Sequence, residues 1–113
     1  MNSSPEILNW SIVNLTHKTQ RAVYHVGKSV HSLLCTENGN NSFSEKSVRF
    51  YLPKSNQYFN DYKALLYSYN NDLSFRIFKK LAKNQWLYLG RRKISSIDSS
   101  SVVNNHVFII DLV

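Results

Sequence analysis

One stretch, residues 73–94, constrains what this chain can fold into more than any other. It holds seven of the fourteen basic residues of the chain and no acidic residue. Large apolar side chains such as Phe75 and Trp86 are threaded between these charges. The seven cations are Arg76, Lys79, Lys80, Lys83, Arg91, Arg92 and Lys93. Because an ordinary protein surface mixes charges of both signs, the stretch predicts an ordered surface that binds a polyanion.

The stretch fits two local structures. As a hairpin, residues 73–80 and 85–94 form strands joined by a turn at 81–84, and alternation puts Phe75 on the face opposite to Arg76. As a helix, the apolar residues recur at spacings of three and four: Phe75, Phe78, Ala82 and Trp86. The aromatic and β-branched content favours the hairpin, and the helix stays open as the alternative.

The rest of the chain predicts more strands than helices. Alternating or apolar runs indicate strands at 10–15, 21–26, 47–52 and 107–112. Residues 60–69 have helical spacing, with Asn60 as the N-cap. Asn- and Ser-rich segments at 36–46 and 95–105 indicate loops. We therefore expect one domain over residues 1–113, mainly β or α+β, built as a small curved sheet or barrel with one or two short helices.

A family resemblance rests on three segments. They are Phe75-Arg-Ile-Phe-Lys79, Trp86-Leu-Tyr-Leu-Gly90 and Val107-Phe-Ile-Ile-Asp-Leu112, spread over about forty residues. This pattern resembles the C-terminal half of PUA-like β-barrel modules. It is most similar to the DNA-reading domains of modification-dependent restriction systems, including the sulfur-recognising kind. The resemblance implies a PUA-like barrel that binds DNA. None of the family's base-flipping or sulfur-pocket residues maps onto this chain.

The overall composition agrees with a nucleic-acid partner. Net charge is +7 with a pI near 9.7, and the 42% hydrophobic content excludes wholesale disorder. The single cysteine, Cys35, excludes an intrachain disulfide and a cysteine zinc cluster, so we expect a buried, inert thiol in the cytoplasm. With three glycines, Gly27, Gly39 and Gly90, the chain has no phosphate-cradling P-loop. We expect no cofactor and no membrane partner.

Aromatic residues, histidines and one acid–lysine step are the other candidate site residues. Tyr88 and Tyr51 are candidates for stacking on bases, whereas we expect Trp86 to belong to the core. Nothing nearby fixes a tautomer for three histidines, so we expect them to face solvent: His17, His25 and His31. The step Asp61-Tyr62-Lys63, with Glu45 upstream, occurs in some metal-dependent nucleases but is common by chance. We assign no catalytic residue and no metal ligand.

Three functions remain open, in this order. The first is a non-enzymatic nucleic-acid-binding module that uses the seven cations of the stretch, with the type of nucleic acid undetermined. The alternative is a small inhibitor of the kind that phages and mobile elements encode. It would bind an acidic surface on a host defence enzyme or on the ribonucleoprotein of that enzyme. A small nuclease or ribonuclease is third. Nothing in the sequence predicts the oligomeric state.

Overall fold

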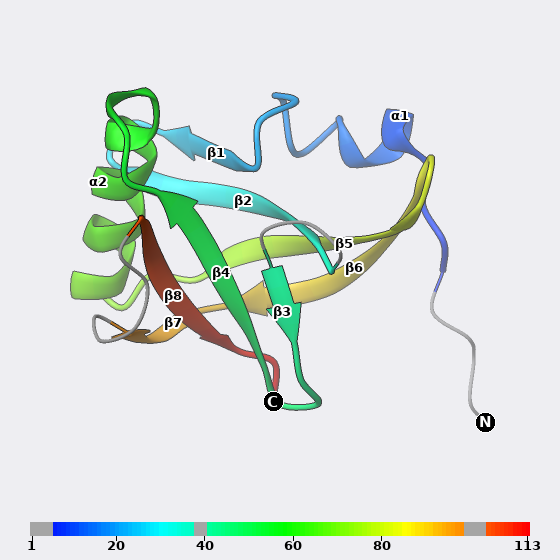
Figure 1. The fold of residues 1–113 in the computed structure, drawn as a ribbon. Helices are drawn as coiled ribbons and strands as arrows, with labels where there is room; N and C mark the ends of the chain where they lie inside the picture. Colours follow the sequence, from blue (N-terminus) through cyan, green and yellow to red (C-terminus); the bar gives the residue numbers. More distant parts are fainter. Residues whose placement is uncertain (1–5, 38–40, 99–103) are drawn as a thin grey trace.

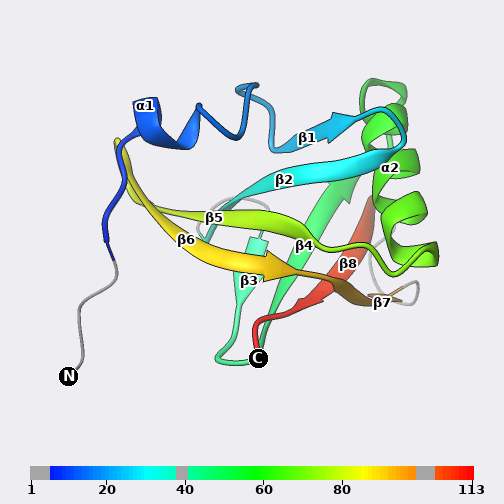
Figure 2. The ribbon, with the colours of Figure 1, turned by 180° about the vertical axis from the view of Figure 1, so that it is seen from behind.

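The protein consists of two four-stranded β-sheets with a helix at one end (Figures 1 and 2). This computed structural model describes residues 6–37, 41–98 and 104–113. The first sheet has the order β1-β2-β5-β6 and the second the order β3-β4-β8-β7. The strands are β1 (Val23–Val26), β2 (Ser29–Thr36), β3 (Asn41–Phe43), β4 (Ser47–Pro53), β5 (Phe75–Ala82), β6 (Gln85–Arg92), β7 (Ile94–Asp98) and β8 (Asn105–Asp111). The prediction of a mainly β fold is confirmed.

The stretch 73–94 is a hairpin, as its composition favoured. Strands β5 and β6 pair antiparallel, and Phe75 and Ile77 are fully buried while Arg76 points to the other face. The predicted four-residue turn is wrong, because Ala82 still pairs with Gln85 and only two residues connect the strands. The second of these, Asn84, has a φ of 58°, a left-handed conformation that asparagine tolerates well.

Gly90 lies inside β6, two residues before the strand ends at Arg92. The pairing of β6 with β5 shifts register between Arg76 and Phe78, opposite this glycine. Gly90 has a φ of 87°, which a residue with a Cβ adopts only with strain. The resulting β-bulge bends the strand, and β7 of the other sheet begins four residues after it, at Ile94.

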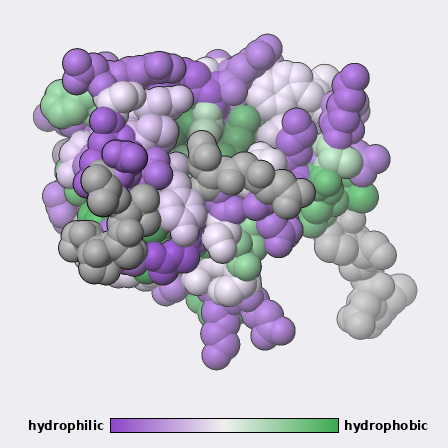
Figure 3. Space-filling view, viewed as in Figure 1, coloured by the Kyte–Doolittle hydropathy of each residue, from purple (hydrophilic) through white to green (hydrophobic). Residues whose placement is uncertain are grey.

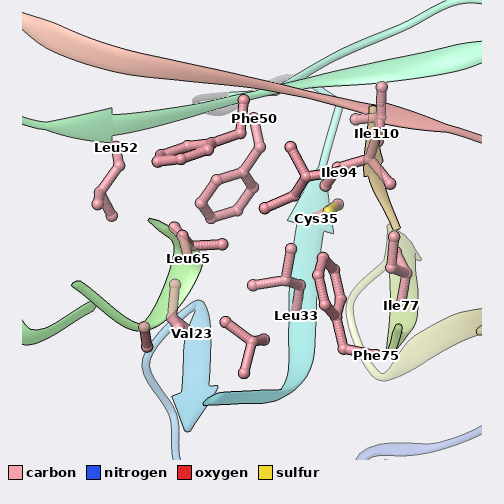
Figure 4. Close-up of a cluster of buried hydrophobic side chains, with 14 residues drawn as sticks. Val23, Leu33, Cys35, Phe50, Leu52, Leu65, Phe75, Ile77, Ile94 and Ile110 are labelled. Carbon is pink, nitrogen blue, oxygen red and sulfur yellow. The ribbon is translucent and has the colours of Figure 1, made fainter. Parts of the chain in front are cut away.

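The main hydrophobic core lies between the two sheets. Phe75 and Ile77 from β5 and Leu33 from β2 face Phe50 from β4 and Ile110 from β8 across the interior (Figure 4). All five side chains are at most 2% exposed. Phe75, Ile77 and Phe50 lie at alternating positions of the strands predicted at 73–80 and 47–52, so sequence periodicity identified part of this core.

Helix α2 (Phe59–Asn70) closes one end of the interior and contacts β1, β2 and β7 (Figure 1). It buries Leu65, which belongs to the predicted helical spacing, and also Ala64, which does not. The predicted cap is wrong, because the N-cap position is Tyr58 and a 3-10 turn, η1 (Asn56–Tyr58), leads into the helix.

Three loop or strand predictions are wrong. Residues 10–15 hold helix α1 (Trp10–Val13), because the Asn9 side chain accepts a hydrogen bond from the backbone N–H of Ile12 and caps the first turn. The predicted loop 36–46 contains β3, which pairs with β4. The predicted loop 95–105 is mostly strand as far as Asp98, and its residues 99–103 lie outside the described part of the chain.

The N-terminal segment covers the outer face of the first sheet and forms a second, smaller core. Val13 of α1 packs with Leu34, Phe78 and Trp86, and Leu8 and Trp10 border this cluster. Leu8 and Trp86 also exchange two backbone hydrogen bonds of 2.8 and 2.9 Å. Trp86 is only 6% exposed, so the prediction that it belongs to the core is confirmed.

Candidate nucleic-acid interface

A cleft of about 950 Å³ opens where the two sheets diverge. Residues from both sheets line it, together with the segments before β1 and before α2. Figure 3 shows this face, with hydrophobic residues in green in its upper middle below a band of hydrophilic residues in purple. Its described lining contains three cations and five aromatic side chains but no acidic residue: Arg21, Lys80, Lys83, Trp10, Phe50, Tyr51, Tyr58 and Trp86. Such a surface is suited to planar, negatively charged ligands.

The β5–β6 turn and α1 form one wall of the cleft. The Asn84 side chain accepts a 2.7 Å hydrogen bond from the backbone N–H of Trp10, which ties the helix to the turn. The Trp10 and Trp86 rings lie 5.7 Å apart between centroids. Lys80 lies across the ladder from Trp86, with its Nζ 5.7 Å from the ring centre. This wall therefore holds two cations of the basic stretch, Lys80 and Lys83, against a fixed aromatic surface.

Arg21 forms part of the opposite wall and is held by three contacts. Its guanidinium donates to Asp61 Oδ2 at 2.6 Å and to the backbone carbonyl of Gln57 at 3.1 Å. It also lies 5.4 Å from the centre of the Tyr58 ring. Because Asp61 neutralises part of its charge, Arg21 attracts an anion more weakly than Lys80 or Lys83 does. Sequence reasoning missed Arg21, which lies outside the basic stretch.

Tyr51 borders the cleft from β4 and is partly exposed. Arg49, two residues earlier on the same strand, forms an ion pair with Asp98, and this contact raises the pKa of Arg49.

Asn41 adds a polar group that the sequence did not single out. It is 8% exposed, and its Oδ1 accepts a 2.9 Å hydrogen bond from the backbone N–H of Thr36. Its Nδ2 is buried and has no hydrogen-bond partner. Among the described residues, the only other buried side-chain nitrogen or oxygen without a partner is His31 Nδ1. Asn41 was predicted to lie in a loop, so nothing in the sequence marked it as buried.

The structure separates the seven cations of the basic stretch. Only Lys80 and Lys83 border the cleft. Lys79 pairs with Glu37 at 3.5 Å and lies 4.3 Å from the centre of the Phe43 ring. At the other end of the hairpin, Arg92 donates to the carbonyl of Leu89. Lys93 forms an ion pair with Asp72 at 2.9 Å. Arg76 and Arg91 border a different, smaller pocket. The stretch is therefore not one continuous patch.

Tyr88, the other stacking candidate, does not border the cleft. It pairs with Phe78 across the β5–β6 ladder, and the two rings lie 5.3 Å apart. It is 44% exposed and borders a groove on the outer face of the first sheet, together with Ile12 of α1. The two candidate tyrosines thus serve different surfaces.

The prediction that the three histidines face solvent is wrong for His17, which is fully buried. Its Nδ1 lies 2.7 Å from Ser32 Oγ, and its Nε2 lies 2.7 Å from the backbone carbonyl of Arg21. Because a carbonyl only accepts, Nε2 carries the proton and Nδ1 accepts from the serine hydroxyl. Burial lowers the pKa of His17. His25 and His31 are partly buried, and His25 lies 3.5 Å from Asp61.

The geometry gives no support to the acid–lysine step. Asp61 is 4% exposed and is engaged by Arg21 and His25, and Lys63 lies over the Phe59 ring. No group of three or more His, Cys, Asp or Glu side chains in the described ranges is placed to hold a metal ion. Cys35 is fully buried, and burial raises the pKa of its thiol to about 12, so the prediction of an inert thiol is confirmed.

The sequence matches no protein-family model and no curated protein. The structure, however, is similar to solved structures of the SUVH5 SRA domain. The likeness to that domain in complex with hemi-methylated CG DNA has a TM-score of 0.73 at 16% identity, over 98% of this chain and 86% of the other. The likeness to the same domain in complex with methylated CHH DNA has a TM-score of 0.69 at 14% identity, over 98% of this chain and 90% of the other. The chain therefore has the fold of an SRA domain. The resemblance to PUA-like DNA-reading modules, predicted from about forty residues, is confirmed, and the likeness in fold extends over 98% of the chain. Within the described residues, no helix is long and apolar enough to cross a membrane.

Proposed function

We propose that this protein is a non-enzymatic nucleic-acid-binding module that takes duplex DNA against the cleft between its sheets. The observation that carries the proposal is the cleft itself, which is lined by lysines and aromatic rings with no acid among its described residues. The SUVH5 SRA domain, which shares this fold, was solved in complex with methylated DNA. Both lines of support point to the same class of ligand.

In this proposal Lys80 and Lys83 neutralise backbone phosphates at the mouth of the cleft. Neither lysine forms an ion pair with a described acid, so their charges are available to a ligand. Tyr51 and Trp10, both partly exposed, offer ring faces beside them. The other five cations of the stretch, Arg76, Lys79, Arg91, Arg92 and Lys93, stay predicted phosphate contacts, but all of them except Arg76 already form an ion pair or a hydrogen bond within the protein.

The test is a fluorescence-anisotropy panel with single- and double-stranded DNA and RNA of one sequence. We expect duplex DNA to bind most tightly, and the double variant Lys80→Gln/Lys83→Gln to bind it at least tenfold more weakly, since each phosphate contact typically contributes on the order of 1 kcal/mol. The matched control, Lys28→Gln/Lys46→Gln, removes the same charge from two exposed lysines outside the cleft lining. Equal losses in both variants would contradict the proposal.

A protein-binding inhibitor is the second candidate, and the N-terminal region favours it. Four large apolar residues around α1 and β6 are exposed by 44% or more: Ile7, Ile12, Leu15 and Tyr88. Exposed apolar side chains gathered in one region are typical of protein–protein contacts. The anisotropy panel separates the two functions, because an inhibitor of this kind binds bare nucleic acid weakly or not at all. In either case we propose a cytoplasmic location, where Cys35 stays reduced.

A further inference from the structure

Arg76 and Arg91 lie directly opposite each other on neighbouring strands. They are register partners in the β5–β6 ladder, next to the bulge at Gly90. Two like charges at paired positions of an antiparallel ladder repel each other and destabilise the sheet. A ligand with negative charge would remove this repulsion, so the pair of arginines is a candidate anion site.

No described acid forms an ion pair with either arginine, although Asp72 and Asp111 border a second pocket that Arg91 also lines. Four of the seven acids are engaged with other cations: Glu37, Asp61, Asp72 and Asp98. Glu6 borders a neighbouring groove that Arg76 also lines, but they form no ion pair. In the described part of the chain, no ion pair reaches Arg76 or Arg91. Both guanidinium groups therefore keep their full charge.

The two arginines border a pocket of about 310 Å³ that has further hydrogen-bond donors. Its described lining includes Ser29, Ser74 and His31 and contains no acidic residue. Arg91 Nε donates to Ser74 Oγ at 3.2 Å, which holds the guanidinium beside the pocket. A small pocket with convergent donors is suited to a single tetrahedral anion rather than to a long polymer.

His31 adds a donor without adding a charge. Its Nδ1 is buried and has no partner, so protonating this atom would leave a buried N–H unsatisfied. The neutral ring therefore carries its proton on Nε2. Burial lowers the pKa of His31, and the charges of Arg76, Arg91 and Lys18 lower it further. Tyr24, which packs edge-on against the imidazole at 5.3 Å, is the other titratable group that contacts this ring.

We propose that Arg76 and Arg91, with His31 and Ser74 beside them, form a binding site for one phosphate group, either free phosphate or the terminal phosphate of a nucleotide. Two guanidinium groups provide the planar, paired donors that match phosphate oxygens. None of these four residues borders the cleft between the sheets. The site thus lies outside this cleft, and the proposal does not depend on DNA binding there.

The test is an NMR titration of the whole chain with four probes: inorganic phosphate, a nucleoside 5′-monophosphate, the same nucleoside without phosphate, and dimethyl phosphate. We expect phosphate and the monophosphate to give saturable shifts of the Arg76 and Arg91 side-chain N–H and His31 ring signals. The nucleoside should give none. Dimethyl phosphate, which models an internal phosphodiester, should bind at least several-fold more weakly because it carries a single charge.

Variants provide the second readout. Arg76→Gln and Arg91→Gln should each weaken phosphate binding about tenfold or more, since each removes a charge-assisted contact. Neither should lower the melting temperature without phosphate, because each removes a repulsion. The control Lys28→Gln, on the exposed β1–β2 turn, should bind phosphate like the original protein.

Three results would overturn the proposal. The first is a set of shifts no larger than those produced by sodium chloride at equal ionic strength. The second is equal weakening by Lys28→Gln. The third is tighter binding of dimethyl phosphate than of inorganic phosphate, which would make the arginines part of a nucleic-acid track. A failure of DNA binding in the cleft variants would leave this site untouched, so the two proposals fail separately.

Discussion

Lys80 lies directly opposite Trp86 in the β5–β6 ladder, and its Nζ is 5.7 Å from the centre of the indole ring. The tryptophan is packed into the second core, whereas the lysine keeps a charge at the border of the cleft. One residue of this cross-strand pair thus stabilises the hairpin, and the other belongs to the proposed binding surface. Changes to the two residues should have different effects.

Replacing Trp86 by Ala should destabilise the fold rather than affect binding alone. The side chain is 6% exposed and contacts Val13, Leu34 and Phe78, so its loss leaves a cavity that costs about 3–5 kcal/mol. Urea unfolding measures this loss. Tyr88→Ala, at an exposed position of the same strand, is the control and should cost much less. A stable Trp86→Ala protein that fails only in binding would contradict the assignment.

Replacing Tyr51 by Ala should leave the fold intact and weaken nucleic-acid binding. Its ring is partly exposed at the cleft, so removing a stacking contact should cost about 1–3 kcal/mol of binding free energy. Anisotropy titration measures the affinity, and a melting curve checks the fold. Tyr51→Phe, which keeps the ring but loses the hydroxyl, should retain most of the affinity. Loss of affinity in both variants would instead assign the hydroxyl a direct role.

The stability of the protein should fall as the pH drops below about 6.5. His17 has a lowered pKa in the folded state, chiefly because it is buried, so the unfolded chain takes up its proton first. The stabilisation that neutral His17 contributes is fully present above 6.5, the pKa of histidine in the unfolded chain, and is lost as the pH falls towards the lower pKa of the folded state. Urea unfolding between pH 7.5 and 5 measures the slope.

His31 and His106 also have pKa values lowered by burial, so they add to the fall of the unfolding free energy with decreasing pH. The variant His17→Gln separates the contribution of His17 from theirs and should show a shallower fall in unfolding free energy. An unchanged slope in this variant, or a His17 ring that titrates by NMR at 6.5 or above, would contradict the account.

Cys35 should be unreactive in the folded protein. Burial raises its thiol pKa to about 12, so almost no thiolate exists at pH 8. A colorimetric thiol reagent should therefore react at the rate of global unfolding, and at once in denaturant. Rapid reaction under native conditions would show that the two sheets separate around this strand.

Much of the fold could be predicted from local patterns. Alternation in the predicted strands 73–80 and 47–52 put Phe75, Ile77 and Phe50 on the faces that the structure buries. Helix α1 was missed because one hydrogen bond from Asn9 outweighed the strand preference of Trp10 and the β-branched residues after it. Strand β3 was missed because its pairing with β4 is a tertiary contact.

The site was predictable only in part. The density of cations marked the β5–β6 hairpin, but alternation and the bulge at Gly90 send the seven side chains to different surfaces. The cleft joins Lys80 and Lys83 to Arg21 and Asn41, which are distant in sequence. No local pattern connects such positions. The burial of His17 likewise depends on Ser32, fifteen positions away.

The salt dependence of duplex DNA binding tests the central claim most directly. Each phosphate that a lysine neutralises contributes a slope of about −0.9 to a plot of log binding constant against log salt concentration. With Lys80 and Lys83 as the main contacts, Lys80→Gln/Lys83→Gln should reduce the magnitude of the slope by about 1.8, whereas Lys28→Gln/Lys46→Gln should leave it unchanged. Equal slopes for the cleft variant and the original protein would contradict a DNA interface at this cleft.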